Sequence, residues 1–123
     1  MDAFMSHKNF EFHNVDMSNE ERMKDLTSIL GYKHKNIDAV FHVGGRARIQ
    51  PSIDNPARTI VCNVNGTFHM LEMARTLKIK NFIYSASSSA YGLTNKLPNV
   101  VGDLENCLNP YSVTKLMGEK LCR

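Results

Sequence analysis

The stretch that decides the fold is NFIYSASSSAYG at residues 81–92, followed after a loop by NPYSVTKLMGEKL at residues 109–121. The apolar, β-branched and aromatic residues of 81–85 predict a buried strand, and the small polar residues after them indicate that this strand ends at a site. Pro110 suits the first turn of a helix, because the backbone N–H that proline lacks would have no partner there. The sequence therefore predicts a strand, a loop and a helix in this order.

Tyr111 and Lys115 lie four residues apart in the predicted helix, so the phenol and the ammonium share one helical face. A tyrosine beside an ammonium group can act as acid or base near neutral pH, and a serine hydroxyl from the strand end would complete a proton-handling set. A pair at this spacing also arises by chance in many helices, as an exposed helix start with a solvated lysine. The preceding strand and serine cluster make the pattern more specific.

The composition is that of one ordinary globular domain over residues 1–123, with 42% hydrophobic and 22% charged residues and a net charge of +3. The basic residues form no block, which argues against a nucleic-acid partner. No apolar run approaches the length of a membrane span, and the N-terminus lacks a signal-peptide apolar region. The three cysteines have no metal-type spacing and fit free thiols in a reducing cytoplasm. We therefore expect a cytoplasmic protein without a nucleic-acid, membrane or metal site.

Two further strands are predicted upstream. Residues 9–15 form a short one, and residues 37–43 (IDAVFHV) suit a strand that is buried on both faces. Between them, Ser18 is expected to cap a helix, with Glu21 three positions on completing a capping box. Gly31 is expected to end that helix.

The longest predicted helix covers residues 56–77, with Asn55 as its N-cap and Pro56 at its first position. Its apolar stripe is Ala57, Ile60, Val61, Val64, Phe68 and Leu71. Residues 93–109 show no period and are expected to form a loop. Three strands alternating with three main helices predict an α/β fold with a doubly wound parallel sheet.

In this order, the residues resemble the extended short-chain dehydrogenase/reductase family of NAD-dependent epimerases and dehydratases, and within it the nucleotide-sugar (UDP-sugar) 4-epimerases. The resemblance runs from about residue 10 to the C-terminus and is most specific in FIYSASSSAYG, NVNGT and NPYSVTKLMGEKL. It implies NAD as cofactor and a nucleotide sugar as substrate. It implies that Tyr111 takes the proton of the sugar 4-hydroxyl, Ser87 hydrogen-bonds that oxygen, and Lys115 holds the nicotinamide ribose. Ser88 and Ser89 would position the sugar.

The resemblance also implies cofactor contacts at the strand ends. Asp16 would hold the adenine; otherwise it is a turn or cap residue. The small-residue strand end from Val43 would line the pyrophosphate and ribose with its backbone, although a glycine pair after a strand is usually a turn. Asn63 would lie beside the ribose; otherwise it points at solvent. The implied cofactor-binding residues are Asp16, Val43, Gly44, Gly45, Asn63, Ser85, Tyr111 and Lys115.

No G-x-G-x-x-G turn or relaxed version of it occurs in these 123 residues, and nothing matches the family's sugar-binding part. The sequence therefore resembles a fragment, an incomplete Rossmann-like domain without a substrate domain. In the usual strand order 3-2-1-4-5-6, the absent strands lie between 9–15 and 37–43. We expect either a gap beside the strand at 38–43 or direct pairing of that strand with 10–15.

Three kinds of function are compatible with the sequence. The first is the central part of a 4-epimerase, with the chain alone expected to be inactive. The second is a non-catalytic remnant that forms a homodimer, or a heterodimer with a full-length relative, through helices 56–77 and 111–122, which family dimers pair into a four-helix bundle. The third is a sugar-nucleotide dehydratase or a ketoreductase. Dehydratases carry Asp-Glu where this chain has Ser88-Ser89, and serines cannot do that proton work at neutral pH.

Overall fold

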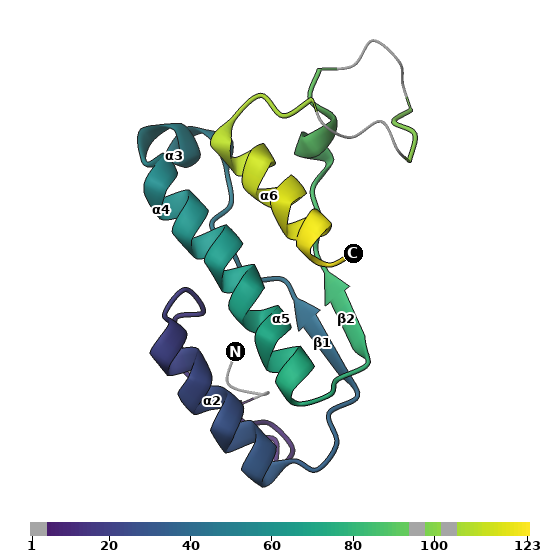
Figure 1. The fold of residues 1–123 in the computed structure, drawn as a ribbon. Helices are drawn as coiled ribbons and strands as arrows, with labels where there is room; N and C mark the ends of the chain where they lie inside the picture. The colour runs from purple at the N-terminus through teal and green to yellow at the C-terminus, as the bar shows by residue number, and fades with distance from the viewer. Residues whose placement is uncertain (1–4, 94–97, 102–105) are drawn as a thin grey trace.

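The structure is a computed structural model that describes residues 5–93, 98–101 and 106–123. Its order of strands and helices is that of an α/β protein, as the sequence predicts (Figure 1). The elements are α2 (Glu20–Lys33), β1 (Ala39–His42), α3 (Ile49–Asp54), α4 (Pro56–Ile60), the π-helical turn η1 (Val61–Asn65), α5 (Gly66–Thr76), β2 (Asn81–Tyr84), the 3₁₀ turn η2 (Ser88–Tyr91) and α6 (Pro110–Leu121). Residues 94–97 and 102–105 of the predicted loop lie outside the described residues.

The two strands form a parallel pair in which Ala39 lies opposite Asn81 and His42 lies opposite Tyr84. Helices α3 to α5 connect them, as a parallel connection requires. The continuous rod formed by α4, η1 and α5 lies between α2 and α6 (Figure 1). The buried core beneath these helices consists of Met23, Val40, Met73 and Ala74.

The two faces of the sheet differ sharply in burial. Val40 and His42 of β1 are buried, whereas Phe41 is 72% exposed and Val43 is 73% exposed. Alternate residues of a strand point to opposite faces, so the helices of the described residues cover one face of β1. The prediction that residues 37–43 are buried on both faces is therefore wrong for this chain by itself.

Residues 9–15 are not a strand, which corrects the prediction of three strands. A strand needs a neighbour to receive its backbone hydrogen bonds, and within the described residues β1 pairs with β2 alone. Direct pairing of β1 with residues 10–15 does not occur. Val15 and Met17 instead pack their side chains against the core.

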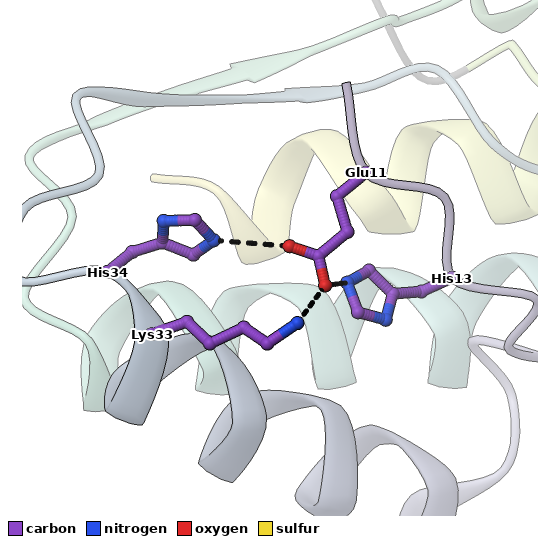
Figure 2. Close-up of polar contacts among 4 residues, drawn as sticks. All are labelled: Glu11, His13, Lys33 and His34. Carbon is purple, nitrogen blue, oxygen red and sulfur yellow. Dashed lines mark hydrogen bonds and ion pairs between the residues drawn. The ribbon is translucent and has the colours of Figure 1, made fainter. Parts of the chain in front are cut away.

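A charged cluster ties this N-terminal segment to the last turn of α2 (Figure 2). The carboxylate of Glu11 contacts the ammonium of Lys33, the Nε2 of His13 at 3.1 Å and the Nε2 of His34 at 3.6 Å. The hydrogen bond from Lys33 is the main cause that lowers the pKa of Glu11. Side-chain contacts thus hold this segment against α2, in place of the backbone hydrogen bonds that would hold a strand in a sheet.

The ends of α2 differ from the prediction. Asn19, rather than Ser18, is the N-cap, and its Oδ1 accepts a 3.0 Å hydrogen bond from the backbone N–H of Arg22. Gly31 does not end the helix, which continues to Lys33. A Cβ on Gly31 would lie 3.0 Å from the Cδ2 of Leu77, so this glycine allows close packing instead.

The predicted helix over 56–77 is present as α4, η1 and α5, with Asn55 as N-cap accepting from the Arg58 N–H at 3.0 Å. The helix α3 and the turn η2 were not expected, because four to six residues are too few to show a helical period.

Candidate active site

The candidate site lies where the two parallel strands end. The Ser85 N–H donates a 3.1 Å hydrogen bond to the His42 carbonyl, so both strands end at the same edge of the sheet. Gly44 and Gly45 follow β1 and, like Ser85 after β2, they are exposed. Ligands of doubly wound proteins bind at this edge, outside the carboxyl ends of the strands.

Lys115 reaches this edge from α6. Its Nζ donates a hydrogen bond to the Ser85 carbonyl and lies 4.4 Å from the centroid of the Tyr84 ring. Burial lowers the pKa of Lys115, because a half-buried ammonium loses hydration. The structure therefore brings together two of the predicted residues, Lys115 and Ser85, and adds Tyr84, which the sequence did not single out.

Tyr111 occupies the first turn of α6, and local hydrogen bonds fix where this turn begins. Asn109 accepts from the Ser112 N–H at 2.9 Å, and the Ser112 hydroxyl accepts from the Asn109 N–H at 3.2 Å, so the two form a capping box. The Tyr111 N–H, which has no partner within the helix, donates to the Ser52 hydroxyl at 3.1 Å. The half-buried Tyr111 side chain and Lys115 are then set by one well-anchored helix.

The serine cluster forms its own turn beside α6. The Ser87 Oγ accepts from the Ser89 N–H at 3.2 Å and lies 2.8 Å from the Ser89 Oγ. Ser87 and Ser89 are half-buried, while Ser88 is exposed. The turn η2 packs against α6, so the serines lie along the helix that carries Tyr111.

Asn63 is buried in the π-helical turn and bridges two parts of the site. Its Oδ1 accepts from the Arg46 N–H at 2.7 Å, and its Nδ2 donates to the Arg46 carbonyl at 3.1 Å and to the Thr114 hydroxyl at 2.9 Å. A Cβ on Gly45 would lie 3.1 Å from that Oδ1, so a glycine lets the loop approach the amide. Asn63 does not point at solvent, and both of its side-chain N–H groups are engaged within the protein.

The bridge continues to the sheet through residues that sequence analysis missed. The Thr67 hydroxyl donates to the Asn63 carbonyl at 2.7 Å and lies 2.9 Å from the Nε2 of the buried His42. Burial, with a smaller effect of Lys115, lowers the pKa of His42. The predicted apolar stripe did not indicate this face, because its members Ile60, Val61 and Phe68 are exposed, whereas the neighbouring polar or small residues Asn63, Gly66 and Thr67 are buried. Together these contacts join β1, α5 and α6 into one unit.

Asp16 lies at the N-terminal side of the site. Its Oδ1 accepts from the Ser18 N–H at 2.9 Å and from the Ser18 hydroxyl at 2.7 Å, and these bonds lower the pKa of Asp16. The next residue, Met17, packs against Gly44 and Gly66, so Asp16 lies near the end of β1 in space. The carboxylate is exposed and makes the contacts of a turn residue.

All three cysteines are free thiols. Among the described residues, no group of three or more His, Cys, Asp or Glu side chains could hold a metal ion. No helix in this part of the chain is long and apolar enough to cross a membrane.

A parallel sheet whose strand ends meet a serine turn and a Tyr-x-x-x-Lys helix defines a protein of the extended short-chain dehydrogenase/reductase class. The family model described as GDP-mannose 4,6 dehydratase matches residues 2–123, and the chain belongs to this family.

Several relatives of this chain are named as epimerases. The bifunctional UDP-glucose 4-epimerase and UDP-xylose 4-epimerase 1 of Pisum sativum is 30% identical over 116 residues, which cover 94% of this chain and 32% of the pea protein. The structure of an epimerase from Methanothermobacter thermautotrophicus is similar with a TM-score of 0.81 and 33% identity, over 95% of this chain and 34% of that one. The UDP-glucose 4-epimerase from Brucella ovis in complex with NAD gives a TM-score of 0.80 at 28% identity, over 96% of this chain and 37% of that one. The chain thus spans about a third of the length of these relatives.

Proposed function

We propose that this chain forms the central, proton-handling part of an NAD-dependent nucleotide-sugar 4-epimerase. The observation that carries the proposal is the position of Lys115, which reaches the Ser85 carbonyl at the end of β2 from the same helix that carries Tyr111. The serine turn beside this helix supplies hydroxyl groups at the same edge. The relatives that are named as 4-epimerases and solved with NAD support the choice of reaction.

Each residue has a role that its chemistry allows. Tyr111 takes the proton of the sugar 4-hydroxyl and returns it, as a general base and then a general acid. Ser87 hydrogen-bonds the same sugar oxygen, and Ser89, whose hydroxyl lies 2.8 Å from that of Ser87, orients it. Lys115 holds ribose hydroxyls of the cofactor and places its charge beside the reacting groups. NAD, when bound, supplies a reversible hydride acceptor for sugar C4.

The residues present fit one part of such a cofactor. Val43, Gly44, Gly45 and Ser85 are exposed at the strand ends, so their backbone groups are accessible to a phosphate or a ribose. Asp16, whose neighbour Met17 packs against Gly44 after β1, is the candidate for the adenine side. The buried Asn63 fixes the loop after β1, because its amide forms two hydrogen bonds with the backbone of Arg46.

Dehydration is the less favoured reaction. A 4,6-dehydratase needs an acid and a base beyond the tyrosine, and this chain offers the hydroxyls of Ser88 and Ser89 at those positions. Ser88 is exposed and Ser89 is hydrogen-bonded to Ser87, and we assign both to positioning the sugar. Among the described residues, the side-chain hydrogen bonds of this turn join Ser87 and Ser89 and include no carboxylic acid.

The test is a chimera in which these 123 residues replace the matching part of the pea 4-epimerase. We expect interconversion of 4-epimers of a UDP-sugar, measured by separation of the two products. A chimera that folds and binds NAD but leaves the 4-hydroxyl configuration unchanged would contradict the proposal. The separate 123-residue polypeptide is expected to bind NAD weakly or not at all in calorimetry, since it contains no Gly-rich turn to hold pyrophosphate. A dissociation constant of about 1–10 μM would refute that expectation.

A second candidate function is association with another subunit through α4–α5 and α6. These helices pack side by side and leave large apolar side chains half-exposed: Ile60, Val61, Phe68, Val113, Met117 and Leu121. Apolar residues gathered on two adjacent helices are typical of an interface. Sedimentation should show a dimer that Phe68→Glu and Met117→Glu weaken, while Tyr32→Glu, on the exposed side of α2, should not. A monomer at every concentration would exclude this function.

A further inference from the structure

Tyr84 contacts both ends of Lys115. Its hydroxyl donates a 3.3 Å hydrogen bond to the Lys115 backbone carbonyl, and its ring lies beneath the Lys115 ammonium at 4.4 Å from the ring centroid. The ring also lies 5.7 Å from that of His42, so it is held from the side of β1 as well. Burial raises the pKa of Tyr84 to about 12, which keeps its hydroxyl a donor.

Gly118 makes room for this arrangement. It is buried on the sheet-facing side of α6, three residues after Lys115. A Cβ at this position would overlap the Tyr84 hydroxyl and lie 2.6 Å from its Cζ. The hydroxyl of Tyr84 therefore occupies the space that any other side chain at residue 118 would fill.

We propose that Tyr84 is a positioning residue that sets the direction of the Lys115 side chain, with Gly118 as the position that admits it. The four-carbon stem of a lysine is flexible, and an aromatic face beneath the ammonium restricts it through a cation–π contact. The hydroxyl bond fixes the helix backbone from which the stem starts. The importance of this direction for chemistry rests on the proposed function, in which Lys115 holds the cofactor ribose.

The position of Lys115 is measurable in the chain as it is. Protons above an aromatic ring resonate upfield, so the Hε protons of Lys115, assigned with Lys115→Arg, should lie upfield of those of exposed lysines. Tyr84→Leu should abolish the upfield shift, whereas Tyr84→Phe, which keeps the ring, should retain part of it. Tyr32→Leu is the matched control, because Tyr32 is 94% exposed on α2, and it should leave the shift unchanged.

Gly118→Ala tests the same geometry from α6. The added methyl must displace the Tyr84 ring, so the upfield shift should be reduced. Gly31→Ala is the matched helical glycine, since its Cβ would meet only the flexible end of Leu77 at 3.0 Å, and it should leave the shift unchanged. A shift that persists in both Tyr84→Leu and Gly118→Ala would overturn the inference. If Tyr84→Leu does not fold, Gly118→Ala decides: an upfield shift as large as that of the unsubstituted chain would then overturn the inference.

The consequence for chemistry is measured separately in the chimera. Tyr84→Leu should raise the KM for NAD and lower kcat about 10-fold each, while Tyr84→Phe should have a smaller effect on both. Failure of the proposed function would appear as inactivity of the unsubstituted chimera, which leaves the resonance test intact. An active chimera in which Tyr84→Leu loses the shift but keeps both constants would overturn the claim that this positioning serves catalysis.

Discussion

Two polar regions join different elements of this molecule, and they differ in burial. The hydrogen bonds around Asn63, Thr67 and Thr114 are buried and join β1, α5 and α6. The contacts of Glu11 with Lys33 and His34 are partly exposed and join the N-terminal segment to α2 (Figure 2). A buried polar group that loses its partner cannot turn to water, whereas exposed ion pairs exchange with water and are screened by salt.

This difference indicates that the candidate site depends more strongly on individual hydrogen bonds than the N-terminal segment does. The residues that set Tyr111 and Lys115 are anchored by bonds whose loss leaves buried groups without partners. Apart from Val15, which packs against the core, the residues that would form a third strand are anchored by exposed contacts that cost little to lose. Substitutions in the buried region should therefore lower activity or the free energy of unfolding more than substitutions in the exposed region.

The largest effect is expected for Tyr111→Phe in the chimera. The ring keeps its packing, but the group that carries the sugar proton is lost, so turnover should fall by about 10²- to 10⁴-fold while NAD binding is nearly unchanged. Lys115→Ala should reduce both turnover and NAD affinity, and Ser87→Ala should be milder than Tyr111→Phe because one hydrogen bond is lost.

The control for this prediction is Tyr32→Phe, which alters an exposed tyrosine far from the strand ends and should keep full turnover. Turnover is measured with saturating UDP-sugar and NAD, and NAD binding by calorimetry. If Tyr111→Phe keeps more than about a tenth of the rate, Tyr111 is not the proton carrier.

An intermediate effect is expected for Asn63→Ala in the chain itself. The substitution removes three hydrogen bonds and leaves the Arg46 N–H and the Thr114 hydroxyl without this partner, which should lower the free energy of unfolding by about 2–4 kcal/mol. Urea unfolding followed by circular dichroism measures the change. Asn65→Ala, two residues along the same helix and exposed, should change it by less than about 0.5 kcal/mol. Equal losses for both variants would show that burial does not distinguish the regions.

The elements that sequence analysis predicted correctly are those with local signals. Asn109 and Pro110 mark the start of α6, and a short run of apolar and aromatic residues marks β2, although β2 is not buried as predicted, since Ile83 is 43% exposed. The segment 9–15 has the residues of a strand, but strand formation depends on a neighbour that local sequence does not specify. The same limit explains Phe41, which has the character of a core residue and lies on an uncovered face.

Within the site, spacing could place Tyr111 and Lys115 on one helix face but not the partners that hold them. The bond from Asn63 to Thr114 joins residues 51 apart in sequence, and that from Tyr84 to Lys115 joins residues 31 apart. Such pairs follow from the packing of α5 and α6 on the sheet, which no local period encodes. The sequence identifies Tyr84 only as part of a strand, because the role of its hydroxyl depends on the position of Gly118 in the folded chain.

The smallest effect is expected at the N-terminal cluster, with Glu11→Gln. The pKa of Glu11 is lowered in the folded chain from its ordinary 4.5, mainly by the hydrogen bond from Lys33. A carboxylate with a lowered pKa stabilises the fold above its unfolded pKa, and this contribution is lost as the pH falls through the folded pKa. The urea midpoint of Glu11→Gln should therefore lie slightly below that of the unsubstituted chain at pH 7, and the two should converge as the pH falls below about 4.5.

Salt gives an independent check, because the cluster is partly exposed. At about 1 M salt, screening acts over roughly 3 Å, so the difference between Glu11→Gln and the unsubstituted chain at pH 7 should shrink. Glu21→Gln, an exposed glutamate on α2, should show little difference under either condition. A Glu11→Gln difference that is as large as that of Asn63→Ala, and independent of salt and pH, would mean that residues 9–15 are held as strictly as the site. The contrast between buried and exposed polar contacts would then not explain how this chain distributes its stability.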